Sequence, residues 1–224
     1  MENPEIIENI KSLVQKKFES EGSGHDWFHI ERVYKLSEYI AGEENANLFV
    51  CQLAALLHDI ADHKFHNGDL EIGPKTAAQI MNEQGVDEVI ALQVIQIIRE
   101  VSFKGAGVAT KPSSLEGQVV QDADRLDAIG AIGVARAFAY GGHKNRLMYH
   151  PDQPPVLHDS FEAYHKSEGH TINHFYEKLL LLKDLINTPT GLKLAQKRHD
   201  FMEQFLKEFY SEWNVEIKES DRCL

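Results

Sequence analysis

The feature that most constrains the fold is an apolar stretch from Leu48 to Leu57, interrupted only by Gln52. Five of the seven residues that follow it, from His58 to Lys64, can ionise. A stretch this apolar is not typical of a surface helix, which keeps one face polar. We therefore expect a helix in the middle of a helical domain, whose end places an imidazole and a carboxylate at the edge of the core.

His58 and Asp59, which follow the stretch directly, are costly to shield from water unless something pairs them. A divalent metal ion is one such partner, and a plain salt bridge is the alternative. Adjacent helical residues point about 100° apart, so this pair cannot complete a coordination shell alone. Further ligands must come from other helices, and the candidates are His29 and the acidic residues within 122–127.

Apolar residues recur at helical spacing along most of the chain, while strand signals are weak throughout. No repeat, low-complexity tract or interdomain linker interrupts this pattern. We therefore predict one all-α domain over residues 1–224, a bundle of about nine helices. The clearest of these helices cover residues 3–20, 26–42 (with Asp26 as N-cap), 45–60, 74–83, 87–100, 115–140, 170–187 and 190–213.

The net charge is −12, from 35 acidic and 23 basic residues. Such a surface repels a nucleic-acid backbone, so we expect no nucleic-acid polymer as a partner. A small phosphorylated ligand stays compatible, because a local cluster of cations and a metal ion can hold it. The count of twelve histidines favours chemistry near neutral pH.

Neither an apolar run of about 18 residues nor a signal peptide occurs, so we expect no membrane association and a cytoplasmic location. Cys51 and Cys223 are far apart and lack metal-type spacing. This argues against a disulfide framework and against a thiolate zinc site. Nothing in the sequence indicates a protein partner or an oligomeric state.

The order of a histidine in an early helix, a His-Asp pair at the end of a buried helix and a later aspartate resembles the HD superfamily of metal-dependent phosphohydrolases. Here these residues are His29, the pair His58-Asp59, and Asp124. The resemblance covers about residues 22–140. It implies that these four residues bind a metal ion in the centre of the bundle.

Bare His-Asp dipeptides are uninformative, since others occur at residues 25–26, 158–159 and 199–200. The pair at 58–59 differs because it ends an apolar helix and has partners in the expected order. More specifically, the chain is similar to short stand-alone bacterial HD hydrolases, whose C-terminal helices resemble residues 170–213. We expect those helices to pack onto the HD core.

The fourth ligand is an aspartate of the acidic segment. Asp122 and Asp124 are two residues apart and face opposite sides of a helix, so only one is expected to bind the metal. The family's Ala-Asp-basic-Leu context matches Asp124, which we prefer. Asp127, one turn further on, either pairs with Arg125 or holds a ligating histidine from behind.

Two histidines and two carboxylates leave open positions on an octahedral ion for water and a phosphate oxygen. This ligand set suits manganese, iron, nickel, cobalt or magnesium, of which we prefer manganese. Such an ion lowers the pKa of its bound water. The resemblance implies that Asp62 handles the proton of that water beside Asp59, if the helix continues far enough to align them. A surface charge is the alternative role for Asp62.

A phosphorylated substrate also needs cations. Lys64, just beyond the His-Asp pair, Lys104, in a glycine-containing segment, and Lys178, in a C-terminal helix, are the candidates. A solvated surface charge is the alternative for each of them.

The resemblance implies hydrolysis of small phosphorylated molecules, most plausibly nucleotides. We favour pyrophosphohydrolysis of nucleoside or deoxynucleoside triphosphates. A nucleoside-monophosphate phosphatase and a cyclic-nucleotide phosphodiesterase are alternatives within the same superfamily. A non-catalytic nucleotide-binding module with a vestigial site is the alternative from a different class.

Overall fold

The computed structural model describes residues 3–19, 26–61, 71–101, 111–156 and 169–215. Within these ranges it contains nine α-helices, one 3-10 helix and no strand, so the predicted all-α fold is confirmed. The helices are α1 (Asn3–Phe18), α2 (Trp27–Glu44), α3 (Leu48–Leu57), α4 (Ile72–Glu83), α5 (Glu88–Val101), α6 (Leu115–Asp127), α7 (Gly130–His143), α9 (Thr171–Glu177), the 3-10 helix η2 (Leu179–Leu185) and α10 (Pro189–Trp213).

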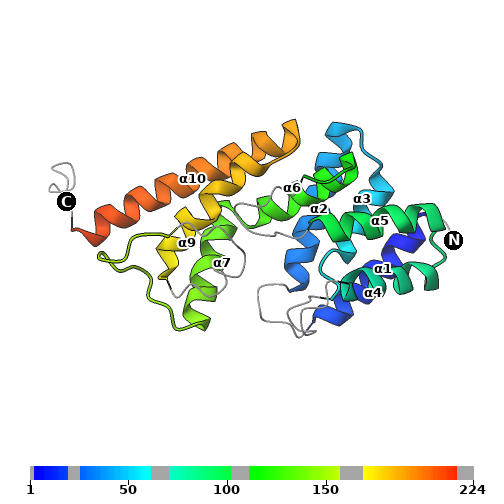
Figure 1. The fold of residues 1–224 in the computed structure, drawn as a ribbon, viewed down its shortest axis with the longest axis horizontal. Coiled ribbons are helices and arrows are strands. Elements are labelled where there is room, and N and C mark those ends of the chain that lie inside the picture. Colours follow the sequence, from blue (N-terminus) through cyan, green and yellow to red (C-terminus); the bar gives the residue numbers. More distant parts are fainter. Residues whose placement is uncertain (1–2, 20–25, 62–70, 102–110, 157–168, 216–224) are drawn as a thin grey trace, which may run out of the picture.

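The helices form two groups joined along one edge by α10. Figure 1 shows α1 to α5 gathered at the N-terminal end of the molecule and α7 with α9 at the opposite end. α10 packs against α2, α6, α7 and η2, so it contacts both groups. α6 lies between them, because it packs against α2, α3 and α5 on one side and against α7 and α10 on the other.

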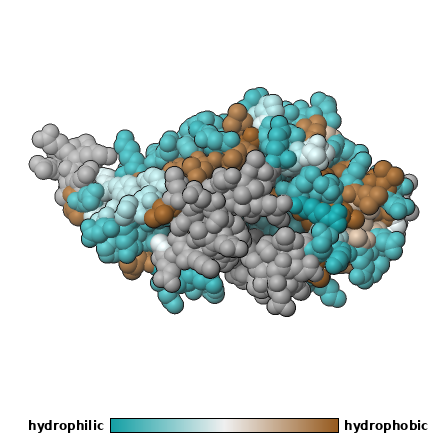
Figure 2. Space-filling view, viewed as in Figure 1, coloured by the Kyte–Doolittle hydropathy of each residue, from teal (hydrophilic) through white to brown (hydrophobic). Residues whose placement is uncertain are grey.

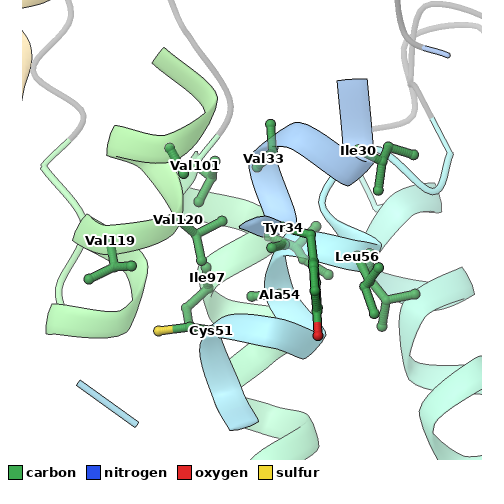
Figure 3. Packing of buried hydrophobic residues seen from close by; sticks show 14 of the residues in the cluster. Ile30, Val33, Tyr34, Cys51, Ala54, Leu56, Ile97, Val101, Val119 and Val120 are labelled. Carbon is green, nitrogen blue, oxygen red and sulfur yellow. The ribbon is translucent and has the colours of Figure 1, made fainter. Parts of the chain in front are cut away.

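The apolar stretch that defines the sequence is the centre of this arrangement. α3 packs against α1, α2, α5 and α6, and every residue from Leu53 to Leu57 is fully buried. Figure 3 shows its side chains Cys51, Ala54 and Leu56 surrounded by apolar groups of neighbouring helices, labelled Ile30, Val33, Tyr34, Ile97, Val101, Val119 and Val120. The predicted central position of this helix is therefore confirmed.

Two predicted helix ends are wrong. α3 ends at Leu57 rather than near residue 60, and a turn follows in which the Ile60 N–H donates to the Leu57 carbonyl at 3.2 Å. α2 runs past Gly42 to Glu44. It ends at Asn45, which adopts a left-handed conformation (φ 56°) and donates its N–H to Ala41. A short asparagine tolerates this conformation, so glycine is not needed to end the helix.

The predicted helix over residues 115–140 is two helices, α6 and α7. The break falls at Gly130, whose φ of +77° is favourable only for glycine. The predicted helix over 170–187 is also interrupted, because Lys178 leaves the helical region with φ −144° and ψ −60°. The N-terminal cap predicted at Asp26 is confirmed, since its side chain accepts from the His29 N–H.

The face seen in Figure 2 is mainly hydrophilic outside the grey region, with hydrophobic side chains dispersed among polar ones. No helix in the described ranges is long and apolar enough to cross a membrane.

Candidate metal centre

Three helix ends bring the candidate ligands together. His29 lies in the first turn of α2, which begins where the Asp26 carboxylate accepts the His29 N–H at 2.9 Å. His58 is the residue that ends α3, and Asp59 follows it. Asp124 lies in the last turn of α6. Since α2 packs against both α3 and α6, residues far apart in sequence meet at one place.

His29, His58 and Asp59 form a group whose ligand atoms all lie within 4.8 Å of one another. An Asp59 carboxylate oxygen, Oδ2, lies 3.5 Å from the Nε2 atoms of both histidines. These distances exceed those of good hydrogen bonds, which are about 2.7–3.2 Å. They suit atoms arranged around a shared cation better than atoms bonded to one another.

The ring nitrogens of both histidines are oriented by hydrogen bonds. His58 Nδ1 lies 2.8 Å from the Ala55 carbonyl oxygen, which can only accept, so Nδ1 carries the proton. His58 Nε2 is then left with a lone pair; it is buried and makes no hydrogen bond within the described part of the chain. His29 Nδ1 likewise lies 2.8 Å from Asp127 Oδ2. A histidine held in this way at Nδ1 presents Nε2 as a metal ligand.

Asp127 lies behind His29 and gathers cations around it. Its carboxylate accepts hydrogen bonds from His29, from Arg32 at 2.6 and 3.0 Å, and from Arg136 at 2.8 Å. Burial opposes the charge of this carboxylate, but the hydrogen bonds from His29 and Arg32 hold the pKa of Asp127 well below its usual range. Of the two roles predicted for Asp127, the contact with a histidine is confirmed.

Arg125 has a different partner from the one predicted, because its guanidinium donates to the Leu185 carbonyl. The sequence interpretation missed Arg32 and Arg136 altogether. A signal existed for Arg32, which follows His29 by three residues on the same helix and therefore lies on the same side. No comparable signal existed for Arg136, which reaches Asp127 from the next helix.

Negative charge dominates the environment of His29. Burial disfavours its charged form, but the hydrogen bonds to Asp127 and Asp59 and the charge of Asp124 outweigh it and raise the pKa of His29 to about 9. The centre therefore stabilises a positive charge at this place, which is the property that a cation site requires.

Asp122 and Asp124 have separate surroundings, as expected for opposite sides of α6. Asp124 Oδ1 lies 3.6 Å from His29 Nε2, and its side chain is partly exposed. Asp122 is fully buried and accepts hydrogen bonds of 2.7–2.8 Å from the backbone and side chains of Asn187 and Thr188. The structure therefore brings Asp124, and not Asp122, to the histidines.

The remaining candidates divide into two sets. Asp62, Lys64 and Lys104 lie outside the described residues, so their predicted roles stay predictions. The helical alignment assumed for Asp62 is wrong, however, because α3 ends at Leu57. Lys178 is described, directly after α9 in the other group of helices.

Together these features define a class: an all-α protein with a buried His/Asp centre able to hold a divalent cation. The HD domain family model matches residues 27–129, the segment that contains all four candidate ligands. A relative from Bacillus subtilis, the protein YpgQ, is 42% identical over 209 residues, which span 90% of each chain. The chain therefore belongs to the HD family.

Solved structures agree with this assignment. An HD-superfamily hydrolase from Bacillus thuringiensis is 43% identical, with a TM-score of 0.76 over 95% of this chain and 99% of its own. Bacillus subtilis YpgQ in complex with ADP is 37% identical, with a TM-score of 0.76 over 95% of this chain and 97% of its own.

Proposed function

We propose that the protein is a metal-dependent phosphohydrolase of small phosphorylated molecules, in particular nucleotides. The observation that carries the proposal is the pair of imidazole Nε2 atoms that share one Asp59 oxygen at 3.5 Å. His29, His58, Asp59 and Asp124 are the proposed ligands. Manganese is the preferred ion among the divalent metals that suit this set.

The residues of the chain orient the reaction. Asp127 and the Ala55 carbonyl fix the two imidazoles with Nε2 inward. Asp124, whose side chain is 35% exposed, lies on the side open to solvent, where water and substrate can enter. A divalent ion bound here acidifies a water molecule and polarises a phosphoryl oxygen. Asp62 remains the residue proposed from the sequence to take up the proton.

Nucleotides are the favoured substrates because YpgQ, which is similar over nearly its whole length, was solved in complex with ADP. We favour cleavage of nucleoside or deoxynucleoside triphosphates to a monophosphate and pyrophosphate. We further propose that residues 1–224 act as a single domain in the cytoplasm. Nucleoside-monophosphate phosphatase and cyclic-nucleotide phosphodiesterase activities are the alternatives, and a non-catalytic nucleotide-binding module is the alternative outside enzymes.

The test is turnover of a nucleotide panel with manganese, with products separated by chromatography. Wild-type protein is expected to release pyrophosphate and a monophosphate, and Asp59→Ala to release neither. Asp200→Ala is the matched control, because Asp200 also follows a histidine but is exposed on α10. Equal turnover by Asp59→Ala and wild type would refute the mechanism. Nucleotide binding without turnover by the wild type would favour the non-catalytic module.

A further inference from the structure

Residues 128–151 contain no aspartate or glutamate, although the whole chain has 35 of these residues. The same segment carries three permanent cations, Arg136, Lys144 and Arg146. In a protein with a net charge of −12, this concentration of positive charge is a local exception. It covers α7 and the segment that follows it.

One face of α7 leads away from the metal centre. Arg136, Tyr140 and Lys144 are spaced by four residues and so lie on the same side of the helix. Arg136 contacts Asp127, the residue behind His29, so this face begins at the metal centre. A helix rises about 1.5 Å per residue, which places Lys144 about 12 Å further along.

Cations gather at the far end of this face. The Lys144 Nζ atom and the Arg146 guanidinium carbon lie 5.7 and 5.8 Å from the centre of the Tyr140 ring. Lys144 is exposed, whereas Arg146 is half-buried, so its charge is only partly hydrated. Partial burial of a charge is costly and needs a compensating interaction.

Helix α9 adds two further groups to this end. Its first residues, Thr171 and Ile172, donate to the carbonyls of Leu147 and Met148 at 2.9 and 3.0 Å, which fixes the segment after Arg146 beside α9. One turn further on, His174 accepts the backbone N–H of Lys178 at its own carbonyl, at 3.0 Å. Both side chains are half-buried.

The three groups influence one another. Burial lowers the pKa of His174 to about 3, and the positive charges of Lys178 and Arg146 lower it further. Two cations and an imidazole donor are thus held close together against their mutual repulsion. An anion with several oxygen atoms is the ligand that relieves this repulsion and accepts from all three.

We propose that Arg146, His174 and Lys178 form an anion subsite that binds a second phosphate group of the substrate, away from the metal centre. The subsite rests on the proposed function and narrows it to substrates with a chain of phosphates. A single phosphate reaches donors only within about 3 Å and cannot contact both ends of the α7 face. A nucleoside triphosphate can.

The test is calorimetric titration of metal-free protein with inorganic tripolyphosphate and, separately, with inorganic phosphate. The double variant Arg146→Gln/Lys178→Gln is expected to bind tripolyphosphate at least tenfold more weakly than the wild type. The control Lys193→Gln/Lys197→Gln removes the same charge from exposed positions of α10 and should bind as the wild type does. Lys178→Arg, which keeps the charge, should retain binding. Thermal unfolding of each variant shows that it is folded.

Equal tripolyphosphate affinity in the wild type and the Arg146/Lys178 double variant would overturn the subsite. Equal weakening in the α10 control would also overturn it, because binding would then depend on overall charge. These results are independent of turnover. If the wild type binds tripolyphosphate through these residues but hydrolyses no nucleotide, the proposed function fails and the subsite stands.

Discussion

At the residue scale, the nitrogen that each histidine presents to the centre depends on one hydrogen bond behind it. The Asp127 carboxylate and the Ala55 carbonyl each occupy an Nδ1 atom at 2.8 Å. The two contacts differ in how they can be tested, because a backbone carbonyl cannot be removed by substitution. Asp127 is therefore the residue through which the orientation of His29 can be examined.

Asp127→Asn is expected to weaken manganese binding by about 10- to 100-fold, because His29 loses the carboxylate that orients it. Fluorescence or calorimetric titration of manganese measures this effect. Asp152→Asn, on an exposed loop, is the control and should bind as the wild type does. Unchanged affinity in folded Asp127→Asn would show that the ring is oriented by other contacts.

The residues at the centre were only partly predictable from the sequence. His58 and Asp59 stand out because they end an apolar helix, and Asp124 was preferred over Asp122 on its neighbours in sequence. The partners of Asp122 were not predictable, because Asn187 and Thr188 lie 65 and 66 residues away and meet it only through packing of α10 on α6. The same holds for Arg136.

At the scale of elements, Asp122 joins two helices. Thr188 caps α10 by accepting the Gly191 N–H, and its own hydroxyl and backbone N–H donate to Asp122 on α6. Burial raises the pKa of Asp122, although the hydrogen bonds from Asn187 and Thr188 oppose that rise. The start of α10 is thus fixed to the helix that carries Asp124 and Asp127.

Asp122→Ala is expected to lower the free energy of unfolding by about 2–4 kcal/mol, because it leaves several buried donors without an acceptor. Urea denaturation measures the change. The exposed Asp200→Ala is the control and should stay within about 0.5 kcal/mol of the wild type. A loss of similar size in both variants would contradict this role for Asp122.

The break between α6 and α7 is a second feature of elements that hydrophobic spacing did not reveal. Apolar and small residues continue through it, so the pattern reads as one helix. Gly130 supplies the turn with φ +77°, and a Cβ atom there would lie 3.0 Å from the Arg198 side chain. Only the three-dimensional path of the chain distinguishes this glycine from the others in the segment.

Gly130→Ala is expected to destabilise the protein by about 1–2 kcal/mol, because a left-handed conformation is unfavourable for alanine. Gly42→Ala should instead stabilise it by about 0.5–1 kcal/mol, since Gly42 lies within α2 with open space around its Cβ position. Thermal unfolding compares the two. The same sign for both substitutions would contradict the assigned turn.

At the scale of the whole molecule, the metal centre draws residues from α2, the end of α3 and α6, and so ties the first half of the chain together. The helical periodicity was sufficient to predict an all-α fold, because most helices bury one apolar face. It could not predict that α10 would contact α2, α6, α7 and η2. Such contacts depend on the shapes of complete helices.

Manganese at about 100 times its dissociation constant should stabilise the folded protein by about 2.7 kcal/mol, because only the folded chain assembles the centre. Differential scanning calorimetry with and without metal measures this as a rise in Tm. The rise should be absent in Asp59→Ala and present in Asp200→Ala. A rise of equal size in Asp59→Ala would place the responsible ion elsewhere.

The central claim is that one divalent ion joins the ends of α2, α3 and α6. Anomalous X-ray scattering from crystals grown with manganese tests it most directly. The account predicts one strong peak within about 2–2.5 Å of His29 Nε2, His58 Nε2 and carboxylate oxygens of Asp59 and Asp124. A peak at Asp122, or none beside the two histidines, would contradict it.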